Sequence, residues 1–165
     1  MRTAAKRARV AASEPERQLD AFVEKFDAEH QKLIRSVRRV LRKRLSTAYE
    51  LVYDNYNFFV IGYSSTERPS DSIVSIAAGA NGVGLCFIHG ARLPDPKKIL
   101  LGSGNQTRFI RLETATVLGR PEVEALIAAA IARAETPLRS SGRGELIIRS
   151  VSAKQRPRRK TPRTS

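Results

Sequence analysis

The chain has 165 residues, of which 41% are hydrophobic and 28% are charged, and a formal net charge of +14. This length and apolar share favour one globular domain with a hydrophobic core, and no apolar run approaches the roughly 18–20 residues of a membrane-spanning helix. The single cysteine, Cys86, excludes an internal disulfide. Because the N-terminal segment also lacks the apolar stretch of a secretory signal, we expect a cytoplasmic protein without a membrane partner.

The positive charge is concentrated at the two ends of the chain. Residues 1–10 contain four cations and no acid, and residues 139–165 contain nine cations and one acid, Glu145. The two ends therefore carry +12 of the net +14, which leaves +2 for the body. Segments this basic and this poor in apolar residues do not fold alone. The predicted division is a disordered basic tail (1–13), a globular domain (14–136) and a basic, mostly disordered tail (137–165) that contains a possible strand (145–151).

Two helices are predicted before the first strand. Ser13 and Glu16 form a Ser-x-x-Glu capping box with Pro15 in the first turn, which predicts a helix that ends near Asp27. A second helix is predicted over 28–44, with one apolar face and one strongly basic face. Acidic side chains form a stripe on the first helix, comprising Glu16, Asp20, Glu24 and Asp27. This stripe either forms ion pairs with the basic face of the second helix or is simply solvated.

The centre of the predicted sheet is a hairpin over 72–90, in which two apolar stretches meet at Asn81-Gly82. Asn and Gly tolerate the positive φ angles of a two-residue hairpin turn, so Ala78 is predicted to face Leu85. Because both faces of the hairpin are largely apolar, we place it in the middle of the sheet rather than at an edge.

The remaining elements surround this hairpin. Strands are predicted at 57–63 and 107–112, a short helix at 97–101 and a last helix at 121–134. Sequential strands joined by short turns indicate an antiparallel sheet. The predicted fold class is therefore a two-layer α+β domain, with an antiparallel sheet of about four or five strands on which the N-terminal helices and a C-terminal helix pack.

The sequence contains no recognisable catalytic motif. The only histidines, His30 and His89, are far apart, and neither zinc-like spacing nor a nucleophile–base pair is present. The acidic stripe is the one set of residues that would suit a hard metal cation, and a solvated face is the alternative. We predict no catalytic residue and no cofactor, which favours a non-enzymatic protein and leaves an enzyme as the alternative.

The loop 102–108 is the best candidate for ligand binding. Its glycines allow a ligand to approach the backbone, and its hydroxyl, amide and basic side chains favour an anion. We place the site where the aromatic segment 49–56 meets this loop, because aromatic walls with a few polar groups are usual in ligand pockets. The predicted ligand-binding residues are Tyr53, Asn55, Lys97, Ser103, Gly104, Asn105, Thr107 and Arg108. A plain tight loop is the alternative interpretation.

The basic C-terminal tail indicates a second kind of interaction. Residues 154–163 hold six cations in ten residues, which would bind phosphates through counterion release and without sequence preference. The predicted nucleic-acid-binding residues are Lys154, Arg156, Arg158, Arg159 and Lys160. A solubilising tail without a specific partner is the alternative.

Several segments carry a resemblance to a known family. These are Tyr53–Asn57, Leu93–Pro96, Gly102–Arg108 and the closing helix after Arg120, in that order. With them, residues 16–135 resemble the YdhG-like family (domain of unknown function 1801). The resemblance implies a small α+β domain with an antiparallel sheet and a largely unestablished activity. A frataxin-like iron-chaperone role, attached to some members, would implicate the acidic stripe.

Three functions therefore compete. The first is a non-enzymatic YdhG-like binding module for a small anionic ligand or partner. The second is a nucleic-acid-associated protein that acts through its basic tails. The third is iron handling by the acidic stripe.

Overall fold

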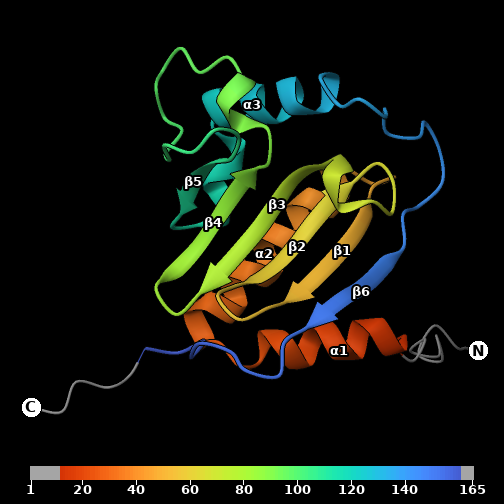
Figure 1. The fold of residues 1–165 in the computed structure, drawn as a ribbon, viewed down its shortest axis with the longest axis vertical. Helices are drawn as coiled ribbons and strands as arrows, with labels where there is room; N and C mark the ends of the chain where they lie inside the picture. Colours follow the sequence, from red (N-terminus) through yellow and green to blue (C-terminus); the bar gives the residue numbers. More distant parts are fainter. Residues whose placement is uncertain (1–11, 161–165) are drawn as a thin grey trace, which may run out of the picture.

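Residues 12–160 of the chain are described by a computed structural model. Six strands form one sheet, and these are β1 (Tyr49–Asp54), β2 (Phe59–Ser64), β3 (Ser72–Gly79), β4 (Gly82–Phe87), β5 (Arg108–Leu112) and β6 (Leu146–Val151). The α-helices are α1 (Glu14–Val23), α2 (Ala28–Arg44) and α3 (Pro121–Ala132). The strand order is β5-β4-β3-β2-β1-β6, and neighbours are antiparallel except that β6 runs parallel to β1 (Figure 1).

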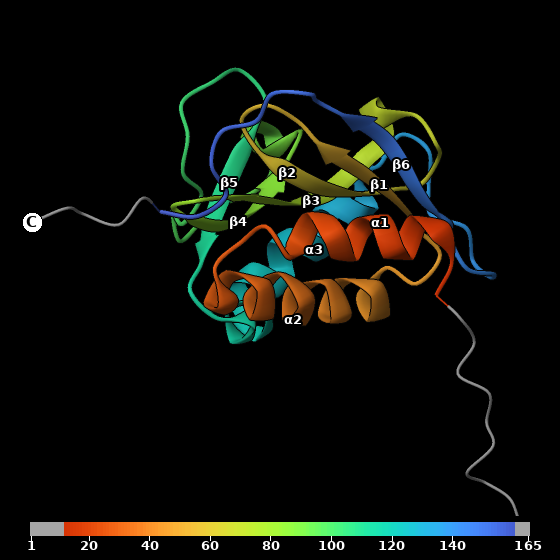
Figure 2. The same ribbon diagram turned by 90° about the horizontal axis from the view of Figure 1, so that it is seen from below.

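The three helices pack on one face of the sheet, which gives two layers (Figure 2). This arrangement confirms the predicted α+β class. The expectation of four or five antiparallel strands is wrong, because the sheet has six strands and is mixed. In the described part of the chain, no helix combines the length and the apolar character that crossing a bilayer requires.

The two additional strands have different origins. The sequence predicts no strand at 49–54, because the turn signal Asp54-Asn55 and the scattered aromatic residues mask its alternation. Strand β1 nevertheless occupies this segment, and its buried residues alternate with partly exposed ones near its end. The possible strand at 145–151 is present as β6 and pairs with β1 after a long connection. That parallel pairing makes the sheet mixed.

The central hairpin has a different turn from the one predicted. Ala78 pairs with Val83 rather than with Leu85, and Ile76 pairs with Leu85, so the two-residue turn is Ala80-Asn81. Gly82, with φ of 147°, follows this turn. The register moves by two residues, which is one full side-chain period, so every apolar residue keeps its predicted face. The hairpin therefore remains central in the sheet, as predicted.

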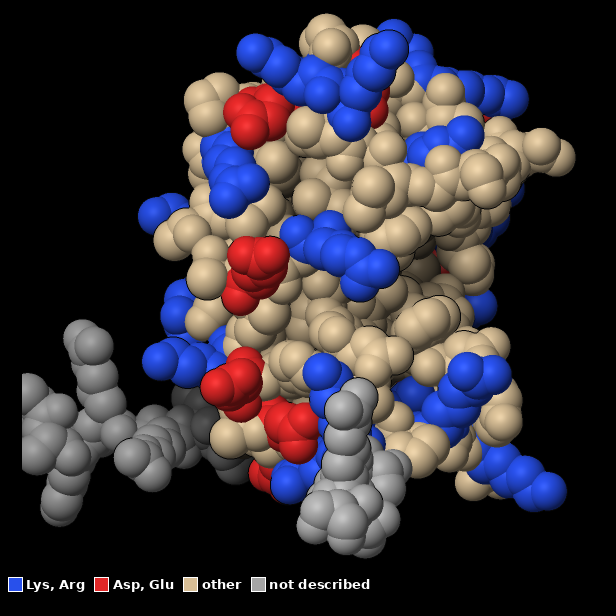
Figure 3. All heavy atoms as spheres, turned by 90° about the vertical axis from the view of Figure 1, so that its left-hand side faces the viewer, with Lys and Arg blue, Asp and Glu red and all other residues tan. Residues whose placement is uncertain are grey.

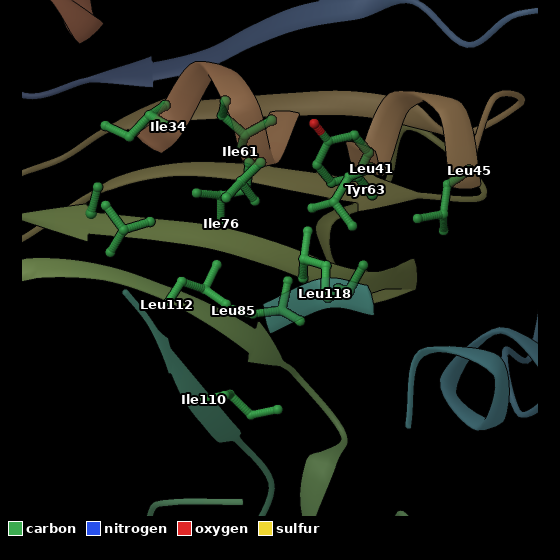
Figure 4. Packing of buried hydrophobic residues seen from close by; sticks show 14 of the residues in the cluster. Ile34, Leu41, Leu45, Ile61, Tyr63, Ile76, Leu85, Ile110, Leu112 and Leu118 are labelled. Carbon is green, nitrogen blue, oxygen red and sulfur yellow. The ribbon is translucent and has the colours of Figure 1, made fainter. Parts of the chain in front are cut away.

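The core lies between the sheet and the helices (Figure 4). Ile34 and Leu41 of α2 meet Ile61, Ile76 and Leu85 of the central strands, and all five are fully buried. Burying each such side chain contributes roughly 1.5–3 kcal/mol relative to leaving it exposed. This contact fixes α2 against the sheet and turns its basic face outward.

The predicted helix at 97–101 is absent from the structure. The Asp95 carboxylate accepts hydrogen bonds from the backbone N–H groups of Ile99 (3.0 Å) and Leu100 (2.9 Å), as a capping residue does. However, Lys98 has a φ of 53°, in the left-handed region, which breaks any continuing helix. The segment is therefore a turn that leads into the 102–108 loop.

The segment after β6 is ordered where the structure describes it. The backbone N–H of Ser152 donates to the Asp54 carbonyl (2.9 Å), and that of Arg156 donates to the Tyr56 carbonyl (2.9 Å). Residues 152–160 therefore run past the turn between β1 and β2 and across the end of α1 (Figures 1 and 2). The sequence predicts a mostly disordered tail, whereas these contacts hold residues 152–160 against the domain. Residues 1–11 and 161–165 lie outside the described residues.

Candidate anion-binding groove

A basic groove of about 600 Å³ lies between α2 and the start of β1. Helix α2 supplies five of the thirteen lining residues, all of them cations, because its apolar face is turned into the core and its basic face points outward. The groove residues are Asp20, Arg35, Arg38, Arg39, Arg42, Lys43, Leu45, Ser46, Ala48, Glu50, Tyr63, Arg143 and Gly144. Six of these are cations and two are carboxylates, so the lining has a net positive charge that favours an anion.

A buried polar network forms the floor of this groove. Arg38 donates to both carboxylate oxygens of Glu50, from Nε (2.9 Å) and from Nη2 (2.9 Å). The same guanidinium donates to Glu16 of α1 at 2.8 and 3.1 Å. The Tyr63 hydroxyl donates to Glu50 at 2.8 Å from a side chain that is fully buried. These bonds join α1, α2, β1 and β2 at one point.

The environment of this network determines its protonation. Burial alone would lower the pKa of Arg38, but its hydrogen bonds to Glu50 and Glu16 outweigh burial and raise that pKa. The hydrogen bond from Arg38 lowers the pKa of Glu16. Burial, reinforced by the nearby Glu50, raises the pKa of Tyr63 well above its usual value. The phenol therefore remains a donor, and Arg38 remains a cation whose charge is already matched by carboxylates.

The remaining cations of the groove differ in how far they are neutralised. Arg35 lies 3.7 Å from Asp20, and Arg42 lies 3.5 Å from Glu50. In contrast, Arg39, Lys43 and Arg143 form no ion pair with any residue of the described range 12–160. All three are exposed. They are the groups of this groove that have charge available for a ligand.

The predicted ligand site at the glycine-rich loop is not assembled. Strands β2, β3 and β4 lie between β1, which carries Tyr53, and β5, which carries Arg108. At the usual strand spacing, β1 and β5 are therefore about 19 Å apart. The pairing also aligns the Asp54 end of β1 with Leu112, whereas Arg108 lies at the other end of β5. The two halves of the expected pocket therefore occupy diagonally opposite corners of the sheet.

Within the loop itself, the polar groups bind one another. The Arg108 guanidinium donates to the carbonyls of Gly104 (2.6 Å) and Thr107 (2.9 Å), so it holds the loop in shape. Lys97, Ser103 and Asn105 are exposed around it. Figure 3 views the molecule from the β5 side and shows cations interspersed with acidic and neutral residues, not one continuous basic surface. The alternative of a structural tight loop fits these contacts.

The two predicted residues on the β1 side also have structural partners. The Asn55 side-chain oxygen accepts a hydrogen bond from the Ser150 hydroxyl at 2.7 Å, which joins the end of β1 to β6. The Tyr53 hydroxyl is buried and has no hydrogen-bond partner within the described range. Burial raises the pKa of Tyr53, and the charge of Arg149 partly offsets this rise. Neither residue faces the loop at 102–108.

The cations of the C-terminal segment divide into two groups. Arg158 is buried and donates to the Asp54 carboxylate (2.8 Å) and to the Asn55 carbonyl (2.6 Å). Arg159 donates to the carbonyls of Glu24 and Lys25, where α1 ends. These two cations hold the segment to the domain. The predicted nucleic-acid-binding residues Lys154, Arg156 and Lys160 are exposed.

Two of the four carboxylates of the acidic stripe form ion pairs with arginines of α2. Glu16 pairs with Arg38 at 2.8 Å and Asp20 pairs with Arg35, which confirms the ion-pair alternative for these two carboxylates. Between residues 12 and 160, no three His, Cys, Asp or Glu side chains gather as they would around a metal ion. Carboxylates held by arginine are poor ligands for iron, so these contacts argue against the iron hypothesis.

Burial raises the pKa of the Cys86 thiol to about 11, which suits the predicted structural role.

A second cavity, of about 430 Å³, lies between the end of α3 and the β2–β3 connection. Its floor includes the buried Ile73 and Phe87. Around this floor, Arg68 is paired with Asp71 at 3.1 Å, and the lining also includes Arg92, Arg133 and Glu135, so that three cations face two carboxylates. This mixed lining is less suited to an anion than the groove along α2.

Sequence reasoning did not find Glu50 or Tyr63 as site residues. The available signal was one acidic residue, Glu50, in a segment that the sequence did not identify as a strand. This acid indicates a site only once β1 is known to face α2. Comparison of the chain with protein-family models, with curated proteins and with solved structures finds no match.

Proposed function

We propose that this chain is a non-enzymatic binding module that holds a small anionic ligand in the groove along α2. The observation that carries the proposal is the convergence of three cations without acidic partners in the described range, Arg39, Lys43 and Arg143, on one groove. The sequence resemblance to the YdhG-like family is part of the proposal, and the α+β fold supports it. The single cysteine supports a cytoplasmic location.

The floor of the groove suits binding rather than proton transfer. Arg38, Glu50 and Tyr63 satisfy one another, so they form a rigid base with no group poised to exchange a proton. An anion above this base would meet the free guanidinium and ammonium groups of the rim. Because the rim is exposed, each contact is screened by water and salt, and affinity should fall as ionic strength rises. A ligand with several negative charges, such as a phosphorylated metabolite, fits best.

The test uses inorganic pyrophosphate as the probe and isothermal titration calorimetry as the readout. The groove variant carries Arg39→Gln, Lys43→Gln and Arg143→Gln. Removing three exposed charges at about 0.5 kcal/mol each should raise the dissociation constant about tenfold. The unfolding midpoint should stay within about 2 °C of wild type, since surface substitutions of this kind change stability little.

A charge-matched variant provides the control. Lys97→Gln, Lys98→Gln and Arg111→Gln remove the same charge around the 102–108 loop, where these residues are exposed. This variant should bind pyrophosphate as wild type does. Equal affinity of wild type and the groove variant would overturn the proposal, and loss confined to the loop variant would return the site to the glycine-rich loop.

A further inference from the structure

Two exposed aromatic residues, separated by Asn57, lie in the turn between β1 and β2. Tyr56 is 51% exposed and Phe58 is 54% exposed, although most other aromatic rings of the described chain lie wholly or partly in the core. Phe58 also lies against the backbone of Gly79, which holds its ring at the surface. Large apolar groups so exposed are candidates for contact with a partner.

The basic C-terminal segment lies against Tyr56, the first of these two residues. The Arg156 backbone N–H donates to the Tyr56 carbonyl (2.9 Å), and its guanidinium lies 5.7 Å from the centre of the Tyr56 ring. Residues 146–160 contain no acidic residue. The exposed cations of this segment are Arg149, Lys154, Arg156, Arg159 and Lys160. The turn therefore combines exposed aromatic rings with positive charge.

The fold holds this combination in place. Buried Arg158 bonds to Asp54 and to the Asn55 carbonyl, just before the aromatic pair in the chain. This anchor fixes the segment so that the exposed guanidinium of Arg156 lies beside the Tyr56 ring. In an unanchored tail, the same cations would supply charge without any defined relation to an aromatic surface.

We propose that the β1–β2 turn and residues 149–160 form a binding surface for single-stranded nucleic acid. Cations bind the phosphates without regard to sequence, and exposed aromatic rings stack on unpaired bases. A duplex hides the faces of its bases, and an anionic membrane or an acidic peptide offers charge without bases to stack. Among polyanions, single-stranded DNA or RNA alone therefore uses both features. This surface is separate from the groove, because the two occupy opposite ends of β1.

The test measures fluorescence anisotropy of labelled 20-nucleotide probes with the full chain. Oligothymidine is compared with an abasic strand of the same length and charge, so that any difference reports on the bases. We expect oligothymidine to bind about thirtyfold more tightly than the abasic strand, from stacking of one base on each of the two rings. The Tyr56→Ala/Phe58→Ala variant should lose this preference and keep its affinity for the abasic strand.

Two further variants separate stacking from other effects. Tyr56→Leu/Phe58→Leu keeps apolar bulk at both positions but removes the rings, so it should behave like the alanine variant while preserving the fold. Lys154→Gln/Arg156→Gln should weaken both probes about equally and reduce the salt dependence of binding. Circular dichroism and thermal unfolding verify that each variant is folded.

The outcomes are distinct. Equal affinity of wild type for the two probes, or tighter binding of a 20-base-pair duplex, would overturn the proposal. Stronger binding to anionic phospholipid vesicles than to oligothymidine would also overturn it and would point to a membrane surface instead. Loss of pyrophosphate binding in the groove variant leaves this result unaffected, so the two proposals fail or succeed separately.

Discussion

The most informative perturbation is Arg158→Met, which removes the cation that anchors the C-terminal segment. Asp54 is fully buried and accepts from Lys25 Nζ (2.7 Å) and from Arg158 (2.8 Å). Arg158 is 4% exposed, and its Nε and Nη1 atoms have no hydrogen-bond partner in the described range. Methionine keeps most of the apolar stem but leaves the Asp54 carboxylate with Lys25 alone.

The expected cost follows from this geometry. Removing one partner of a buried ion pair typically costs about 3–5 kcal/mol, because the other charge stays buried without compensation. Lys25 remains and is itself partly exposed, so the loss for Arg158→Met should be near the lower end, about 3 kcal/mol. In a domain of this size, that corresponds to a fall in the unfolding midpoint of about 6–12 °C.

The measurement is urea unfolding of four proteins: wild type, Arg158→Met, Asp54→Asn and the double variant. Because Asp54→Asn leaves the Arg158 guanidinium buried without its carboxylate, it should cost at least as much. The double variant should be more stable than the sum of the two losses predicts, by about 1–3 kcal/mol. Lys154→Met, at an exposed position in the same segment, is the control and should change stability by less than about 0.5 kcal/mol. If Arg158→Met changes stability as little as this control does, the buried anchor described above does not exist.

Three further changes test other parts of the structure. Tyr63→Phe removes the hydroxyl that donates to Glu50 and should lower the free energy of unfolding by about 1–2 kcal/mol in urea, since the rest of the ring is retained; an unchanged value would contradict the buried network. Gly144→Ala would place a Cβ atom 1.8 Å from the Ala48 carbonyl oxygen. We therefore expect the free energy of unfolding to fall by about 2 kcal/mol or more and the amides of β6 to exchange hydrogen faster. Exchange rates equal to those of wild type would argue against this close approach. Burial would raise the pKa of Asp54, but hydrogen bonds from Lys25 and Arg158 outweigh it and lower that pKa. The Asp54 carboxylate should therefore stabilise the fold above its unfolded-state pKa of about 3.9, and this stabilisation should be lost as the pH falls through the lower folded-state pKa. Unfolding curves of wild type between pH 6 and pH 2.5 should show this dependence. The Asp54→Asn variant should show less of it.

Local signals account for the elements that the sequence predicts well. Helix α1 begins where Ser13 caps it, with the Glu16 N–H bonded to the Ser13 hydroxyl at 3.4 Å. The bounds of α2 agree with the predicted 28–44, because its apolar spacing and its basic final turn are properties of the segment alone. The hairpin at 72–90 is also local, and its apolar faces survive a register error of two residues. These features need no knowledge of distant parts of the chain.

The features that the sequence did not predict depend on distant pairing. Strand β1 is buried because β2 and β6 lie on either side of it, and the alternation of its own six residues is too short to predict this. The site has the same dependence, since Glu50 becomes the floor of a groove only when β1 faces α2. At the loop 102–108, composition alone favours an anionic ligand, whereas the structure shows that the Arg108 guanidinium donates to carbonyls of the loop itself.

The C-terminal segment shows why a run of cations in a sequence does not define a uniform basic surface. Arg158 is neutralised inside the domain, Arg159 binds carbonyl groups at the end of α1, and Arg156 lies beside an exposed ring. The anchor and the binding surface are therefore physically linked but can be separated by mutation. Arg158→Met should lower both stability and oligonucleotide affinity, because the segment loses its fixed position. Arg156→Gln should lower affinity and leave the unfolding curve unchanged. If Arg158→Met lowers stability yet leaves binding to oligothymidine intact, the segment binds nucleic acid as a free chain, and its ordered position beside Tyr56 is not what recognises the bases.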